Sequence, residues 1–368
     1  MGLKAGIVGL PNVGKSTLFN AITKKNILAA NYPFATIDPN VGIVTVPDER
    51  LAKLEEMYVP ERLIATSYEF TDIAGLVKGA SLGEGLGNKF LSHIREVDAI
   101  VEVVRCFDDN NIIHVENTVD PIRDIEIINL ELILSDLEIL TNRIDKIKKK
   151  AETNRDKEAL EELNILKKAK DNLEKNIPLR LIEFSEEEMN VLSSFAFLTI
   201  KPMIYLANVS EDDVAKEDND YVKKVKEYAS KENSKVIKMC AKLESELSEL
   251  NDDDKKEMLN AVGIEESGLD KLIKETYDLL GLATYFTVGS DEVRAWTFKK
   301  GMNAKKCAGI IHTDFEKGFI KAEVMSYDDL IKYGSEQKVK EAGRARLEGK
   351  DYIMQDGDIC LFRFNVTK

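Results

Sequence analysis

The stretch Gly9-Leu10-Pro11-Asn12-Val13-Gly14-Lys15-Ser16 determines the fold that we expect for this chain. Its two glycines are separated by four residues and followed by Lys and Ser, which is the phosphate-loop pattern. Residues 5–8, immediately upstream, are typical of a short buried strand, and residues 17–22 are typical of the first turns of a helix. A phosphate loop requires this strand–loop–helix context, so the sequence predicts an α/β nucleotide-binding domain here.

The chemistry of the loop assigns roles to its residues. Glycines allow backbone N–H groups to surround the phosphates, and the helix N-terminus adds partial positive charge. Lys15 is expected to contact the β- and γ-phosphates and to act in catalysis, whereas Ser16 is expected to bind Mg2+. The expected nucleotide-binding residues of the loop are Asn12, Val13, Gly14, Lys15, Ser16 and Thr17.

A second phosphate-sensing element, Thr71-Asp72-Ile73-Ala74-Gly75, follows a strand expected at residues 65–70. In phosphate-loop switches an Asp here holds magnesium and the Gly N–H meets the γ-phosphate. Asp72 is therefore a candidate metal ligand and Gly75 a candidate catalytic residue. Thr36, on a Pro-containing loop between the two motifs, is the candidate that closes over the metal in the triphosphate state. Taken alone, such residues are also ordinary turn residues.

Length and composition narrow the class of protein. A chain of 368 residues is long enough for two or three domains. Residues 1–4 lead directly into the first strand and no apolar run could span a bilayer, so we expect a cytoplasmic protein without a membrane partner. The four scattered cysteines argue against a disulfide framework or a zinc site. A net charge of −14 argues against coating of nucleic acid, and DNA is not an expected partner.

Two further regions differ from the first domain. Apolar residues recur every three or four positions over 125–151 and again over 160–173, which predicts a coiled-coil hairpin of two helices. From residue 282 the sequence changes to short strands around one helix at 304–312, which suggests a small β-grasp module. Within it, Asp356-Gly357-Asp358 predicts a hairpin between residues 352–355 and 359–364.

Three segments carry a family resemblance: NYPFATIDPN at 31–40, DIAGLVKGA at 72–80 and GEGLGN at 83–88. With them the chain resembles the Obg-related translation-factor GTPases, and among these the YchF / Obg-like ATPase family. The resemblance runs the whole length and implies three parts. They are a P-loop NTPase domain (G domain) at 1–120 and 200–281, an inserted helical coiled coil at 121–199, and a C-terminal β-grasp domain, called TGS, at 282–368.

Hydrolysis needs a group that positions water, and Leu76, which follows the Asp-x-x-Gly motif, cannot form a hydrogen bond with water. Of the three histidines, His114 follows a strand expected at 99–105. A histidine could orient or deprotonate water, although an ordinary polar loop residue is an equally good interpretation from the residues alone. The family carries a His in this motif near the nucleotide, so the resemblance favours His114 as catalytic.

Base recognition differs from that of ordinary GTPases, which read guanine with Asn-Lys-x-Asp. The matching loop here is Asn208-Val209-Ser210-Glu211, which keeps the Asn but replaces the Lys and the Asp. Without the Asp carboxylate, a site loses its main reason to prefer guanine. The residues thus argue against strict GTP selectivity, and the resemblance implies ATP. The expected contacts to the base are Asn208, Val209 and Glu211, together with Cys240 and Ala241, which could contact it through backbone groups.

The expected cofactor is Mg2+, and Asn12 is a candidate ligand for K+, with a loop-shaping role as the equal alternative. The resemblance implies ATP, the ribosome (with the large subunit as the expected docking site) and RNA as partners, and a monomer, although helical stripes alone leave oligomeric state open. Basic residues that could contact RNA phosphates in the last domain are Arg294, Lys299, Lys300, Lys305, Lys306, Arg344 and Arg346. Scattered surface charge explains them equally well.

Three functions remain open at this point. The first is an ATP-hydrolysing switch whose nucleotide state alters ribosome binding. The second is a ribosome- or RNA-binding scaffold in which hydrolysis is incidental. The third is a conventional Obg-type GTPase. Ribosome association that ignores the nucleotide would favour the scaffold, and tighter binding of GTP than of ATP would favour the GTPase.

Overall fold

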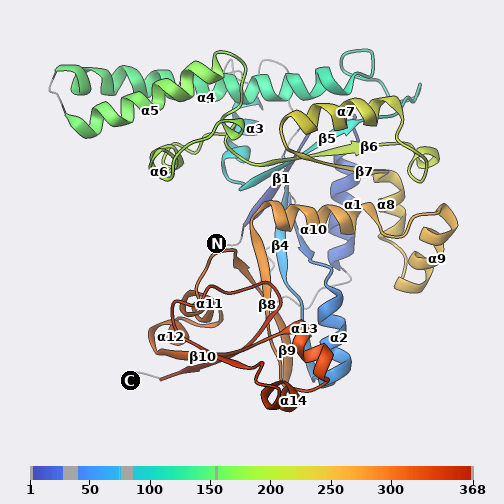
Figure 1. Cartoon of the computed structure of the whole chain (residues 1–368). Coiled ribbons are helices and arrows are strands. Elements are labelled where there is room, and N and C mark those ends of the chain that lie inside the picture. The colour runs from blue at the N-terminus through green and yellow to red at the C-terminus, as the bar shows by residue number, and fades with distance from the viewer. Residues whose placement is uncertain (1–2, 28–39, 74, 76–85, 154–155, 366–368) are drawn as a thin grey trace. The chain divides into compact units, whose positions relative to one another are not determined.

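The computed structural model describes residues 3–27, 40–73, 75, 86–153 and 156–365. It consists of two compact units, which we describe separately (Figure 1). The first contains Met1–Val44 and Glu69–Leu272, and the second contains Thr45–Tyr68 and Ile273–Lys368. No helix in the described ranges has the length and apolar character needed to cross a membrane.

The first unit is built on a six-stranded sheet in the order β2-β4-β1-β5-β6-β7. Its strands are β2 (Val41–Thr45), β4 (Ser67–Asp72), β1 (Lys4–Val8), β5 (Ala99–Arg105), β6 (Met203–Asn208) and β7 (Lys235–Met239). The pairings from β4 through β7 are all parallel. Every residue of β5 and β6 is buried, as expected of central strands in a parallel sheet that is covered on both faces.

Helices cover both faces of this sheet. Figure 1 shows α1 and α8 on the face opposite α4 and α7. The helices of the unit are α1 (Lys15–Ile27), α3 (Leu86–Arg95), α4 (Pro121–Thr153), α5 (Lys157–Leu173), α6 (Glu186–Ser193), α7 (Asp220–Lys231), α8 (Ala241–Leu247) and α9 (Asp252–Val262), with short 3-10 turns at Leu179–Leu181 and Glu211–Asp213. A further helix, α10 (Gly268–Leu279), leads from the first unit into the second.

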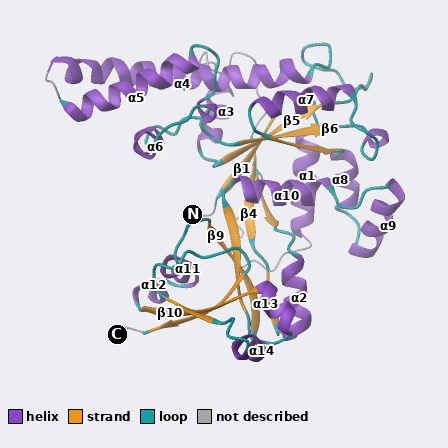
Figure 2. Ribbon diagram, in the orientation of Figure 1, coloured by secondary structure: helices purple, strands orange, loops and turns teal. Residues whose placement is uncertain are grey.

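Helices α4 and α5 form the expected hairpin, which extends beyond the edge of the sheet in Figure 2. Asp156 caps α5 by accepting a hydrogen bond from the backbone N–H of Ala159. The two apolar stripes face each other, and Leu140, Leu163 and Leu166 are fully buried between them. The helical period in the sequence is thus confirmed as the seam of a helix pair.

Buried polar contacts anchor the hairpin to the sheet. Asp136 of α4 accepts hydrogen bonds from the backbone N–H groups of Leu198 and Thr199, at 2.9 and 2.8 Å. Arg180, in the segment that returns from α5, lies 3.0 Å from Glu232 with both side chains only 6% exposed. The hydroxyl of Tyr205 on β6 donates to the same carboxylate at 2.7 Å. The hairpin root is therefore fixed to strand β6 by specific polar pairs.

The second unit has a mixed sheet in the order β11-β10-β12-β8-β9-β3. Its strands are β3 (Arg62–Ile64), β8 (Leu282–Thr287), β9 (Glu292–Lys299), β10 (Phe319–Ser326), β11 (Arg346–Glu348) and β12 (Asp358–Phe364). Its helices are α2 (Glu49–Tyr58), α11 (Ala304–Ile311), α12 (Thr313–Lys317), α13 (Tyr327–Tyr333) and α14 (Glu336–Glu341). One apolar cluster includes Cys307 of α11, and a second includes Leu54 of α2 and Leu330 of α13.

The second unit differs from the sequence expectation in two places. Residues 45–68, which we expected in the nucleotide domain, belong to this unit, because Leu51 and Leu54 pack in its core and β3 pairs in parallel with β9. The prediction of a hairpin between residues 352–355 and 359–364 is wrong. β12 pairs instead antiparallel with β10 and parallel with β8, because its buried side chains fill the centre of the sheet.

Glu102 is an acidic side chain in the interior of β5, 1% exposed, and its Oε2 atom has no hydrogen-bond partner in the part of the chain that the structure describes. Burial raises its pKa well above the usual range. The nearby Arg180 acts in the opposite direction, and the carboxylates of Glu232 and Asp124 add to the rise. A carboxyl group in such a place favours its protonated form.

Replacing Glu102 by Gln should therefore flatten the dependence of stability on pH. Because the folded-state pKa is raised, the contribution of Glu102 to stability is present below its unfolded pKa and is lost as pH rises through the folded pKa. Gln resembles the protonated carboxyl at every pH. The melting temperature of E102Q, measured by calorimetry, should exceed that of the wild type by an amount that grows from about pH 5 to about pH 8. Each kcal/mol of difference in stability corresponds to about 2–4 °C.

The matched control is Glu96→Gln, because Glu96 is exposed. It should leave the pH dependence of the melting temperature as in the wild type. The same pH dependence in E102Q and the wild type would contradict the burial argument.

Candidate nucleotide-binding site

The phosphate loop connects β1 to α1, as the sequence predicts. Asn12 and Gly14 both adopt positive φ angles, 64° and 98°. A Cβ at Gly14 would overlap the side-chain nitrogen of Asn208, so this position needs glycine for space as well as for backbone conformation. Ser16 is exposed in the first turn of α1, which leaves its hydroxyl available to a ligand. Val13 is buried beneath the loop, and Thr17 is half-buried.

The two phosphate motifs meet in the structure. The Nζ atom of Lys15 lies 2.6 Å from Oδ1 of Asp72, and the Lys15 side chain is only 10% exposed. A Cβ built on Gly75 would lie 3.8 Å from the carbonyl oxygen of Gly9, so Gly75 runs beside the phosphate loop. A cation, a carboxylate and a close backbone approach are thus assembled at the end of β1. Thr36 and Leu76 lie outside the described residues.

This donor set fits a magnesium ion. Asp72 offers a carboxylate and Ser16 offers a hydroxyl, both of which are hard oxygen ligands of the kind that Mg2+ takes. In the described ranges, no group of three or more His, Cys, Asp or Glu side chains could hold a metal by itself. Such a sparse donor set suits an ion that completes its shell with phosphate oxygens and water rather than with a protein cage.

Asn208, at the end of β6, joins the phosphate loop to the base loop. Its Nδ2 donates to the carbonyl of Val13 at 2.8 Å, and its Oδ1 accepts from the backbone N–H of Ala241 at 2.9 Å. Its own carbonyl accepts from the N–H of Cys106 at 2.8 Å. The sequence predicts a contact between Asn208 and the nucleotide, whereas the structure uses both ends of its amide to hold the surrounding loops.

The remaining expected base contacts are mostly buried or paired. Val209, Cys240 and Ala241 are at most 3% exposed, which leaves their backbone groups as the atoms that could contact a base. Burial raises the pKa of the Cys240 thiol. Glu211 forms an ion pair with Lys242, with 3.1 Å between Oε1 and Nζ. Glu211 is thus paired with a cation of α8, and its side chain is one methylene longer than that of the Asp with which GTPases read guanine.

His114 lies on the loop after β5 and is 4% exposed. Its Nε2 lies 2.8 Å from Oδ2 of Asp124, and its Nδ1 accepts from the backbone N–H of Glu116 at 3.1 Å. Since Nδ1 accepts a hydrogen bond, the proton of the neutral ring is assigned to Nε2, which donates to Asp124. Both ring nitrogens are therefore occupied within the protein.

Arg105 and Asn12 hold in place the loop that follows β5 and carries His114. The sequence indicated this role for neither residue. The guanidinium of Arg105 donates to the carbonyls of Phe107, Asp109 and Ile112, at 3.0 to 3.2 Å. From the other side, the side chain of Asn12 donates to the carbonyl of Ile113 at 3.0 Å. Asn12 thus couples the phosphate loop to the residue next to His114. An arginine at the end of an apolar strand is the one sequence signal that could have indicated this arrangement.

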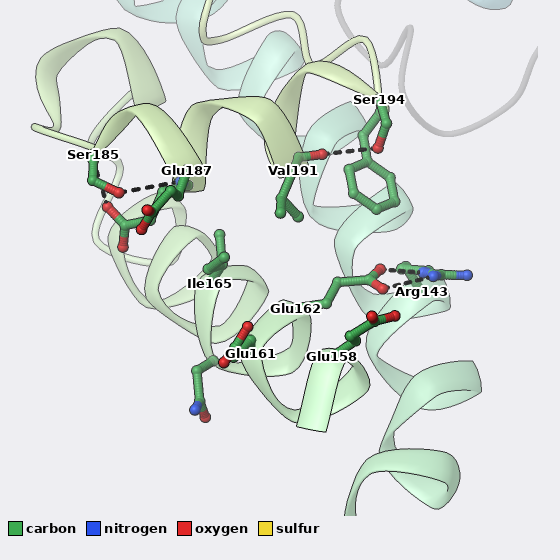
Figure 3. A pocket seen from close by; sticks show the side chains of 12 residues that line it. Arg143, Glu158, Glu161, Glu162, Ile165, Ser185, Glu187, Val191 and Ser194 are labelled. Carbon is green, nitrogen blue, oxygen red and sulfur yellow. Dashed lines mark hydrogen bonds and ion pairs between the residues drawn. The ribbon is translucent and has the colours of Figure 1, made fainter. Parts of the chain in front are cut away.

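A groove of about 800 Å³ lies elsewhere, on the helical hairpin (Figure 3). Glutamates of α5 and α6 surround it, including Glu158, Glu161 and Glu187, and Figure 3 shows Glu162 paired with Arg143. Carboxylates repel phosphate, so this groove is unsuited to a nucleotide. The site at the end of β1 is the one whose chemistry fits.

Comparisons with known proteins agree with this geometry. A family model described as a 50S ribosome-binding GTPase matches residues 4–168, and the model YchF-GTPase_C, described as a protein of unknown function, matches residues 282–365. The Ribosome-binding ATPase YchF of Bacillus subtilis (strain 168) is 60% identical over 367 residues, and that of Escherichia coli O157:H7 is 53% identical over 366 residues, with 100% of each chain covered in both cases.

A solved structure, that of the Schizosaccharomyces pombe YchF GTPase, matches with a TM-score of 0.91 at 44% identity, over 98% of both chains. The fold and the assembled phosphate motifs define a P-loop nucleoside triphosphatase of the G-domain type. With full-length relatives at this level of identity, the chain belongs to the YchF family.

Proposed function

We propose that this protein is a ribosome-associated ATPase that hydrolyses ATP to ADP and phosphate, and whose bound nucleotide controls its binding to the ribosome. The observation that carries the proposal is the assembly of Lys15, Asp72 and Gly75 beside a base loop without a free Asp. The full-length relatives named Ribosome-binding ATPase YchF support the same function.

The residues at the end of β1 have separable tasks in this mechanism. Lys15 neutralises charge on the β- and γ-phosphates, and the N–H of Gly75 donates to the γ-phosphate. Ser16, Asp72 and Thr36 would hold Mg2+, which would supply positive charge to offset that of the phosphates during transfer to water. The ion pair between Lys15 and Asp72 keeps both side chains at this place before the nucleotide arrives.

The remaining residue roles and the partners that we propose rest on the family and on the site together. His114 orients the attacking water, since Leu76 cannot. Asn12 is a candidate K+ ligand, although its Nδ2 already holds Ile113. We propose the large ribosomal subunit and RNA as partners, a monomer, and a cytoplasmic location. Of the basic residues that we expected to contact RNA, Lys300, Arg344 and Arg346 pair with acidic neighbours, whereas Lys299 and Lys306 are exposed and are the candidates for contacts with RNA phosphates.

ATP should bind more tightly than GTP, by roughly 10-fold or more, because the Glu211 carboxylate is paired with Lys242 rather than free to accept from guanine. Titration calorimetry on nucleotide-free protein with Mg2+ measures both affinities. Lys15→Ala is the control and should weaken both nucleotides. Tighter binding of GTP would instead place the protein with conventional Obg-type GTPases.

Ribosome binding should depend on the nucleotide. Co-sedimentation with ribosomes should differ at least several-fold between a non-hydrolysable ATP analogue and ADP, because only the triphosphate engages Gly75 through its γ-phosphate. The Lys15→Ala variant should lose this difference. Full association of Lys15→Ala with ribosomes, whatever the nucleotide, would favour the scaffold function instead.

His114→Ala should leave ATP affinity unchanged and slow turnover by roughly 10²-fold, the lower range for loss of a general base. Single-turnover hydrolysis and equilibrium titration separate the two quantities. His93→Ala is the matched control, since His93 lies in the last turn of α3, and it should retain full turnover. Wild-type turnover in His114→Ala would remove His114 from the mechanism.

A further inference from the structure

The position of His114 raises a question that its proposed role does not answer. A residue that orients water must present a ring nitrogen to it, yet the His114 side chain is only 2% exposed and both nitrogens are in hydrogen bonds. The contact at Nε2 is made to a carboxylate at 2.8 Å, which is short and charge-assisted. The contact at Nδ1, to a backbone N–H at 3.1 Å, is the weaker of the two. The structure therefore contains His114 in a state that cannot contact water.

Asp124 is held firmly on its other side. Its Oδ1 accepts from Nη2 of Arg123 at 3.0 Å, and Nη1 of Arg123 donates to Thr118 at 2.9 Å. The backbone N–H of Asp124, in the first turn of α4, donates to the carbonyl oxygen of Asp120, which immediately precedes the helix. The carboxylate is thus fixed to a helix of 33 residues, so its pairing with His114 fixes the ring as well.

The backbone next to His114 is already tied to the phosphate loop. Asn12 holds the carbonyl of Ile113, and Arg105 holds three carbonyls earlier in the same loop, those of Phe107, Asp109 and Ile112. Ile113 itself is 76% exposed on the loop surface. These contacts keep the backbone beside His114 close to the phosphate loop, so release of the ring from Asp124 and Glu116 is the change that a contact with water requires.

We propose that Asp124 is a positioning residue that holds His114 in a resting state and must release it for ATP hydrolysis. Because Asp124 belongs to the first turn of α4, any partner of the hairpin that shifts this turn also changes the availability of His114. This inference rests on the proposed function, in which His114 orients water. It assigns Asp124 the opposite effect from that of an acid that assists a catalytic histidine.

The first test is Asp124→Ala, measured by ATP turnover without ribosomes. Loss of one charge-assisted hydrogen bond should raise kcat roughly 10-fold, because the population with a free ring increases. KM for ATP should stay the same, since Asp124 does not touch the phosphate loop. Glu126→Gln, an exposed acid on the same helix, is the matched control and should leave kcat unchanged.

A spectroscopic measurement reports on the ring directly. Imidazole ¹H–¹⁵N spectra of the wild-type protein should show His114 protonated at Nε2 only. In Asp124→Ala the same ring should show exchange between its two tautomers, which a change confined to helix stability would not produce. An unchanged His114 spectrum in that variant would overturn the proposal.

Combined variants separate the failure of this proposal from the failure of the proposed function. The double variant His114→Ala/Asp124→Ala should turn over ATP as slowly as His114→Ala. If Asp124→Ala lowers kcat while His114→Ala also does, His114 stays catalytic and Asp124 assists it, which overturns the resting-state role. If His114→Ala has no effect, His114 is removed from the mechanism and the resting-state role of Asp124 fails with it, whereas the proposed ATPase function is still decided by the nucleotide titrations.

Asp124→Asn keeps the fold testable if the alanine variant is unstable. The Asn side chain retains an oxygen acceptor but removes its charge, so the hydrogen bond to His114 weakens without leaving a cavity. Its melting temperature should stay near that of the wild type, and kcat should rise in the same direction by a smaller factor. A fall in kcat at an unchanged melting temperature would contradict the proposal.

Discussion

Parallel pairing of β4, β1, β5 and β6 is the constraint on which the rest of the first unit depends. Parallel strands direct their carboxyl ends toward one edge, where α/β proteins bind their ligands. Register places Ile7 beside Asp72, and Arg105 beside Asn208. Each of these strands therefore delivers one element of the site to the same edge. The phosphate loop follows β1, and the His114 loop follows β5.

Buried polar groups then fix how the helical hairpin meets this sheet. These groups are the ion pair between Arg180 and Glu232 and the side chains of Tyr205 and Asp136. Their contribution to stability is small, because the cost of removing charges from water offsets much of the attraction between them. Their geometry, however, permits only one seating of the hairpin root. The same reasoning applies to His114 and Asp124, whose contact is directional and links the beginning of α4 to the edge of the sheet.

The elements that could be predicted from sequence were those with a local period or motif. The phosphate loop, the Asp-x-x-Gly turn and the helical stripes each carry their signal within a few residues, and their neighbours in space followed from the fold class. Contacts between distant residues had no such signal. Asn208 holds Val13 across 195 positions, and nothing near Asn208 in the sequence indicates it. Residues 45–68 were misassigned because their buried face is completed by strands from far along the chain.

The second unit is built from one early and one late segment of the chain, and this affects how it can fold during synthesis. α2 and β3 are made early, but their partners β9 and β12 are made only after the whole nucleotide domain and its hairpin. Strand β12 lies inside the sheet, between β10 and β8, so no earlier segment can close that core. While the chain is being translated, Leu51 and Leu54 have no cover from their own unit. The apolar face of α2, an otherwise charged helix, therefore lacks its native cover until nearly all of the chain has been made.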